Sequence, residues 1–216
     1  RLSVRSEESV AEGDVAGTRH VSFRASDVTT DTPLVNIVHH HDDDWEHVPL
    51  YRTSTFPSLS SEMKQVLRHG SFEVIPSVFK RILTDAEIAP TLDVFATPRN
   101  SKLPKFFTSR EDAFKQSWEL DVLWICAPFE QLDAVVDKIL LDQAEGIIVI
   151  PLWKSQPWFS RLARVAVKWW DLPHDQAVFM TPSGTVIPSK RDMCIRVVIF
   201  NAFQALQRSL RHAEMH

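Results

Sequence analysis

Apolar residues follow no sustained period over residues 1–58, whereas from there to the end of the chain they recur at regular spacing. The first stretch is rich in Ser, Thr, Asp and Glu, and its apolar surface is too small to offset the entropy lost on ordering. We therefore expect residues 1–58 to form an extended or disordered acidic arm and residues 59–216 to form one α/β domain.

Apolar residues at helical spacing predict several helices in this domain. Ser60 or Ser61 is a suitable cap for the first helix, which Gly70 ends, and Pro76 opens the second. The same spacing recurs over 129–142, 158–170 and 202–211.

Runs of β-branched and apolar residues alternate with these helices and predict strands over 91–96, 105–108, 122–127, 147–153 and 194–200. A Pro-Ser-Gly turn within 178–187 suits a hairpin. This order predicts a Rossmann-like, mostly parallel sheet with helices on both faces and a C-terminal hairpin. Ligands of such sheets bind at the carboxyl ends of the strands, here the loops after Ala96, Ala127 and Pro151.

The composition of the chain excludes several classes of protein function. The chain has five glycines and neither a P-loop nor a GxGxxG turn, which excludes the common nucleotide-binding signatures. Cys126 and Cys194 lie in apolar stretches and form no metal or disulfide framework. No apolar run approaches the roughly 18 residues of a membrane span, so we expect a soluble, intracellular protein, organellar if Arg1 is a processed N-terminus.

Charge is distributed unevenly along the chain, whose net charge is −4. Residues 1–60 carry five basic against ten acidic residues, and the remainder carries 19 against 18. The domain thus lacks the basic excess with which proteins neutralise phosphates, and nucleic-acid binding is weakly supported. Arg161, Arg164 and Lys168 would form one basic stripe on the predicted 158–170 helix, as a solvated face or as a phosphate-contacting ridge.

One run combines imidazoles with carboxylates, both of which bind metals: His39-His40-His41-Asp42-Asp43-Asp44-Trp45-Glu46-His47. Successive side chains of an extended segment point to opposite sides, so three adjacent histidines do not converge on one ion. We expect a solvated linker here and no metal site.

The middle of the chain carries a series of longer motifs, which are Leu92-Asp93-Val94-Phe95-Ala96-Thr97, Asn100, Leu103-Pro104, Phe106, Asp112-Ala113-Phe114, Trp118, Ala127-Pro128-Phe129, Ile150-Pro151-Leu152-Trp153 and Gln156-Pro157-Trp158-Phe159. Over residues 72–173 they resemble a segment of retrotransposon polyproteins, notably of tyrosine-recombinase (DIRS-type) elements. In those elements the segment follows the reverse transcriptase and ribonuclease H, whose carboxylates this chain lacks. The segment is similar to phage-type DNA adenine methyltransferases.

This resemblance implies S-adenosylmethionine as the cofactor of an active relative. It assigns Asp93 and Asn100 to the first cofactor loop, Asp112 to the position near the cofactor's adenosine, and Cys126-Ala127-Pro128-Phe129 to the catalytic NPPF tetrad. In amino-methylating enzymes the first tetrad residue is Asn or Asp, whose oxygen accepts a hydrogen bond from the target amino group. A cysteine is a feeble acceptor, and Ala127 replaces the first proline. We therefore expect a methyltransferase-like scaffold without catalysis and without a bound cofactor.

Each candidate residue also has a purely structural interpretation. Asp93 and Asp112 are suited to capping a turn and the short 113–118 helix, respectively, as well as to holding a cofactor. Phe129 fits a helix core as well as a stack on a flipped base. Core packing is likewise the alternative to a stacking platform for four tryptophans, Trp153, Trp158, Trp169 and Trp170.

Three functions remain open on these grounds. The first is a retroelement-derived, methyltransferase-like domain without turnover that serves as a binding or structural module. The second is an accessory subunit of a larger, organellar or other, assembly, whose N-terminal arm wraps partner proteins. The third is an active S-adenosylmethionine-dependent amino-methyltransferase of DNA or RNA.

Overall fold

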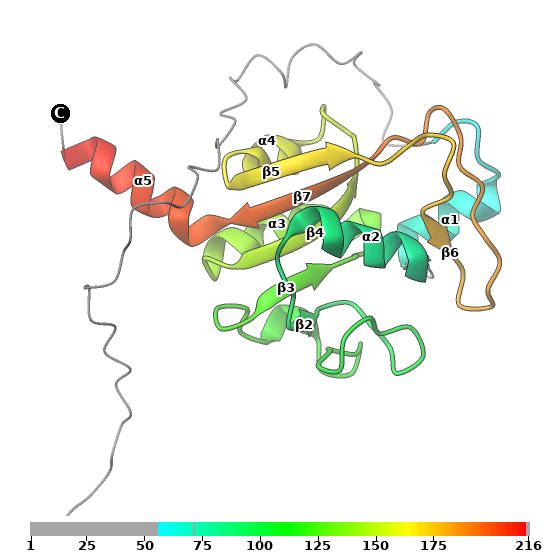
Figure 1. Ribbon diagram of the computed structural model, residues 1–216, viewed down its shortest axis with the longest axis horizontal. Helices are drawn as coiled ribbons and strands as arrows, with labels where there is room; N and C mark the ends of the chain where they lie inside the picture. The colour runs from blue at the N-terminus through cyan, green and yellow to red at the C-terminus, as the bar shows by residue number, and fades with distance from the viewer. Residues whose placement is uncertain (1–55, 71, 215–216) are drawn as a thin grey trace, which may run out of the picture. The chain divides into compact units, whose positions relative to one another are not determined.

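A computed structural model describes residues 56–70 and 72–214 of the chain (Figure 1). Its helices are α1 (Ser61–His69), α2 (Pro76–Ala86), α3 (Leu132–Leu141), α4 (Pro157–Ala163) and α5 (Ala202–Glu214), with the 3-10 turns η2 (Ala113–Lys115) and η3 (Phe129–Gln131). Its strands are β1 (Glu73–Val74), β2 (Leu92–Asp93), β3 (Val122–Ile125), β4 (Glu145–Pro151), β5 (Ala166–Asp171), β6 (Phe179–Met180) and β7 (Ile195–Asn201).

The main sheet has five strands in the order β2-β3-β4-β7-β5. The pairs β2–β3 and β3–β4 are parallel, whereas β7 is antiparallel to both of its neighbours, β4 and β5. Four strands thus run in one direction, and the fifth lies inverted between them. The predicted α/β class is confirmed, with a mixed sheet.

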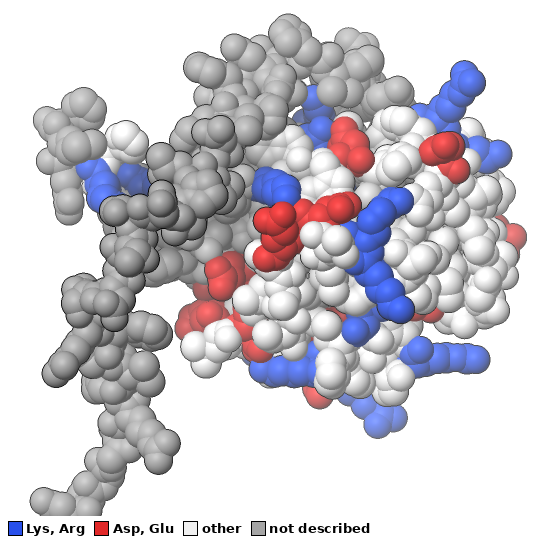
Figure 2. All heavy atoms as spheres, viewed as in Figure 1, with Lys and Arg blue, Asp and Glu red and all other residues white. Residues whose placement is uncertain are grey.

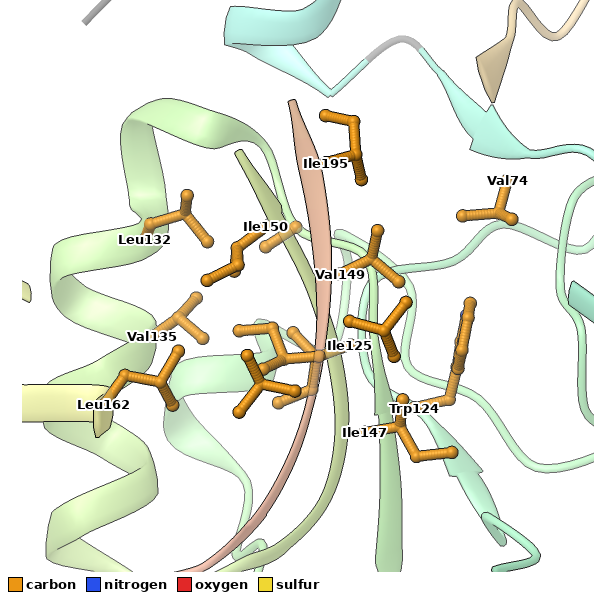
Figure 3. Packing of buried hydrophobic residues seen from close by; sticks show 14 of the residues in the cluster. Val74, Trp124, Ile125, Leu132, Val135, Ile147, Val149, Ile150, Leu162 and Ile195 are labelled. Carbon is orange, nitrogen blue, oxygen red and sulfur yellow. The ribbon is translucent and has the colours of Figure 1, made fainter. Parts of the chain in front are cut away.

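The core is centred on β4 and β7, which are buried along almost their whole length. Figure 3 shows Leu132 and Val135 of α3, with Leu162 of α4, on one side of the sheet, and Trp124 and Ile147 on the other. On that second side, Phe79 of α2 meets the Trp124 ring edge to face, with the ring centroids 4.7 Å apart.

The first helix begins and ends where the sequence predicts, and the second begins where it predicts. Ser60 Oγ accepts a hydrogen bond from the Met63 N–H, and the N–H of Gly70, at φ 79°, donates to Val66 O. The left-handed conformation favours glycine, and a Cβ at residue 70 would lie 2.5 Å from Pro128 Cγ. Pro76 opens α2 at its first position.

The predicted 158–170 helix is wrong in its second half. α4 ends at Ala163, and Ala166–Asp171 form β5, an edge strand paired with β7. Val167, Trp169 and Trp170 are β-branched or aromatic, and the backbone of β7 requires a partner on that side. The helical spacing that continues past Ala163 is therefore coincidental.

The predicted hairpin turn is present but belongs to a second sheet. Gly184 N–H donates to Thr181 O and Ile187 N–H to Phe179 O, and Met180 bridges Val186. β6 pairs with β1 as an antiparallel two-stranded sheet, separate from the five-stranded one.

Two predicted strands are short. β2 covers two residues of the predicted 91–96 strand, and the 105–108 strand is reduced to a bridge between Asp93 and Phe106.

The last residues of the predicted arm pack on the domain, since Phe56 is 3% exposed and the Ser58 N–H donates to Asp192 Oδ2 at 2.9 Å. Residues 1–55 of that arm lie outside the described residues. None of the helices in residues 56–70 and 72–214 combines the length and hydrophobicity of a transmembrane span.

Candidate functional site

A cavity of about 340 Å³ opens at the carboxyl ends of β2 and β3, the edge at which the sequence predicts a ligand. The loop after β2, the loop after β3, the end of α1 and the segment around η2 enclose it. Its lining residues include Phe95, Thr97, Asn100, Phe107, Thr108 and Phe114.

Asp93 lies behind the wall of this cavity rather than in its lining. The side chain is buried at the end of β2, where Oδ2 accepts the Lys102 backbone N–H at 2.8 Å. Oδ1 has no hydrogen-bond partner among the described residues. Burial raises the pKa of the Asp93 carboxyl to about 6, although the Lys102 hydrogen bond and ammonium oppose the shift. The ammonium of Lys102 is itself paired with Glu73, and both side chains are largely buried.

Asn100 and Asp112 both line the cavity, and both also hold local backbone. Asn100 Oδ1 accepts from the N–H of Thr97 at 2.7 Å and from its hydroxyl at 2.9 Å. Asp112 Oδ1 caps η2 by accepting the Phe114 N–H at 3.3 Å, and its Oδ2 lies 3.0 Å from Lys115 Nζ. Asp112 adopts φ 51°, a conformation that aspartate tolerates better than most residues. The capping interpretation of Asp112 is therefore realised in the structure.

The residues at the tetrad position divide between cavity and core. Cys126 and Pro128 line the cavity, whereas Ala127 is 0% exposed. Burial, reinforced by the negative charge of Asp93, holds the pKa of the Cys126 thiol well above its usual range. A neutral thiol and a buried methyl group thus occupy the two positions at which the resemblance expects an acceptor amide and a rigid ring.

Phe129 is a core residue. It is 3% exposed, and its ring lies 5.2 Å from that of Phe72 and 5.6 Å from that of Trp153, both edge to face. Trp158 is also buried, whereas Trp153, Trp169 and Trp170 are half-buried.

The predicted basic stripe does not exist as one helix face. Arg161 on α4 pairs with Asp133 at 2.5 Å and with Asp137, while Arg164 is exposed at the end of the helix. Lys168 lies on β5, where its ammonium donates to Asp85 O at 2.6 Å. On the face shown in Figure 2, acidic and basic side chains are interspersed.

A polar cluster at the cavity rim was not predicted. His69 Nδ1 lies 3.0 Å from Glu130 Oε1, and its Nε2 lies 2.6 Å from Gln65 Oε1. His69 and Glu130 are far apart in sequence, and no motif connects them. No group of three metal-ligating side chains occurs in residues 56–70 and 72–214, and the predicted His39–His47 linker lies outside them.

The lining combines three aromatic rings with hydroxyl and amide groups, which suits a planar, partly polar ligand. It does not fit S-adenosylmethionine as a methyl donor, for two reasons. The carboxylate of Asp93 does not line the cavity, and the side chains at the tetrad position offer no oxygen to an acceptor nitrogen.

Compared with protein-family models and with curated proteins, the sequence gives no match.

Proposed function

We propose that this chain is a retroelement-derived, methyltransferase-like domain that transfers no methyl group and serves as a binding or structural module. The residue motifs between Leu92 and Phe159 support the descent. The sheet supports it too, because an antiparallel strand inserted beside the last parallel one is typical of the Rossmann-like methyltransferase fold.

The composition of the tetrad position carries the proposal. Cys126 contributes an uncharged thiol to the cavity, and Ala127 is enclosed in the core. Of the nearby oxygens, Asn100 Oδ1 and Asp112 Oδ1 already accept backbone N–H groups. Loss of one preorganised polar contact to a transition state typically costs about 3 kcal/mol, and here the whole acceptor is missing.

Calorimetric titration of the full chain with S-adenosylmethionine and with sinefungin tests the proposal, together with transfer of a radiolabelled methyl group to DNA and RNA. We expect no binding of micromolar strength and no transfer. Circular dichroism confirms that the sample is folded. Methyl transfer that Asp93→Ala abolishes would contradict the proposal, and so would micromolar binding of either ligand.

A second candidate is an accessory subunit whose N-terminal arm binds partner proteins. Burial of Phe56 and Leu59 in the core cluster favours it, because the residues that directly follow the arm in the sequence are anchored on the domain. Co-purification of tagged full chain with defined partners, lost when residues 1–55 are removed, is the expected result. Equal recovery with and without the arm would exclude this candidate.

A further inference from the structure

Exposed apolar side chains gather at the end of the sheet opposite the cavity. Leu120, before β3, is 95% exposed and Leu141, at the end of α3, is 77% exposed. Both line a hollow of about 510 Å³ with Phe203 of α5, which is 52% exposed. Leu206 and Leu210 continue this surface along α5. Such a concentration of apolar surface marks an interaction site.

α5 leads away from the end of β7, and no other helix or strand of the described residues lies along it (Figure 1). Asn201 caps its start, since its Oδ1 accepts the Gln204 N–H at 2.8 Å. Beyond Ala202 no described side chain of the helix is buried. Phe203, Leu206 and Leu210 nevertheless form a stripe at spacings of three and four residues. A helix of this length is only marginally stable alone in water, so the apolar stripe requires a partner to pack against.

The charges of α5 and of the hollow indicate which partner covers the stripe. The last turns of α5 carry Arg208, Arg211 and His212, whereas the exposed carboxylates at the rim of the hollow are those of Glu119 and Glu145. The stripe and the hollow are therefore apolar surfaces with rims of opposite charge. Residues 1–60 carry ten acidic against five basic side chains, so their excess charge has the same sign as the rim of the hollow. Repulsion between like charges therefore disfavours this segment as the occupant of the hollow.

We propose that two copies of this chain associate through α5, packed antiparallel about a two-fold axis near Leu206. Phe203 of one copy then meets Leu210 of the second, and each Leu206 meets its counterpart. The helix is about 20 Å long, so its basic last turn reaches the hollow at the base of the other helix. A two-fold contact of this kind uses every complementary pair twice. This inference goes beyond the proposed function and does not depend on it, because the cavity lies at the other end of the sheet.

Sedimentation velocity of the full chain across micromolar concentrations tests the proposal, and we expect a monomer–dimer equilibrium. Leu206→Glu brings two carboxylates together at the axis, so it should raise the dissociation constant by about tenfold or more. Val186→Glu is the matched control: this residue is 51% exposed on the hairpin, and the substitution should leave the equilibrium unchanged. Circular dichroism and thermal unfolding verify that both variants fold.

A charge exchange tests the orientation of the helices. Arg211→Glu alone and Glu119→Arg alone should each weaken the dimer, and the double variant should recover much of the lost affinity. A chain that stays monomeric at all concentrations would overturn the proposal, as would a dimer that Leu206→Glu leaves intact. Association without recovery in the double variant would overturn the antiparallel arrangement.

Discussion

Asp93 and Lys102 are joined inside the protein by a backbone N–H that donates to Oδ2 at 2.8 Å, while Oδ1 has no hydrogen-bond partner among the described residues. The ammonium of Lys102 is paired with Glu73, and the neighbouring Cys126 thiol is neutral. A buried carboxylate with one unsatisfied oxygen destabilises the fold when it is ionised.

Ionisation of Asp93 should therefore make the fold less stable as the pH rises. Burial raises the pKa from 3.8 to about 6, so the folded protein binds this proton more tightly than the unfolded chain. The free energy of unfolding should fall between about pH 4 and pH 6 through this group. Asp93→Asn should remove that slope and increase stability near pH 7.5 by on the order of 2 kcal/mol. Urea denaturation at pH 4, 5, 6 and about 7.5 measures both effects; an unchanged slope would show that Asp93 is not the group responsible.

Three glycines at positive φ should respond differently to alanine. At Gly146 a Cβ would lie 2.3 Å from the Leu123 carbonyl oxygen, so Gly146→Ala should be the most damaging. At Gly70 the new Cβ meets Pro128 Cγ at 2.5 Å, and we expect a loss of about 2–3 kcal/mol. Gly184 has open space around it, so only backbone strain of about 1 kcal/mol applies. Urea denaturation gives the order, and a Gly184 variant as unstable as the Gly146 variant would contradict the steric argument.

Removal of the Asp142 carboxyl should destabilise the fold through the groups it leaves behind. Its Oδ2 accepts the N–H of the fully buried Trp118 at 2.9 Å and lies 2.6 Å from Lys138 Nζ. Asp142→Ala should cost about 2–3 kcal/mol, whereas Asp142→Asn keeps the hydrogen bond and should cost about half as much. Equal losses in the two variants would assign the stabilisation to the charge pair rather than to the Trp118 hydrogen bond.

The Cys126 thiol should be unreactive in the folded protein. Burial and Asp93 hold its pKa well above the usual range, and little thiolate is present at neutral pH. The pKa of the Cys194 thiol is raised by burial too, but this half-buried residue is less enclosed than Cys126 and its Sγ lies 3.8 Å from His174 Nδ1. Iodoacetamide should label Cys194 first and Cys126 only on unfolding. Mass spectrometry of the labelled peptides measures the order, and rapid labelling of Cys126 at pH 7 would contradict its assignment as a neutral thiol.

Local signals in the sequence were sufficient for part of the fold. Ser60, Gly70 and Pro76 define helix ends through their own backbone chemistry, so α1 and α2 could be predicted. β5 could not, because Trp169 and Trp170 fit a helical period, and only the unpaired edge of β7 makes them a strand.

The candidate site, too, could be predicted from the sequence only in part. The sheet order brings the loops after β2 and β3 to one edge, so Asn100, Asp112 and Cys126 could be predicted to lie together. The direction of the Asp93 side chain depends on the Lys102 N–H and on the Glu73–Lys102 pair, contacts that no motif in the sequence encodes.

The small β1–β6 sheet joins a segment that precedes the large sheet in the sequence to a segment that lies between two of its strands. β1 precedes every strand of the main sheet, and β6 belongs to the excursion between β5 and β7. The ladder can therefore form only after β1 to β6 have been synthesised, and its long sequence separation raises the contact order of the domain. A piece of this domain cut anywhere between Val74 and Phe179 therefore lacks one of the two strands of this ladder.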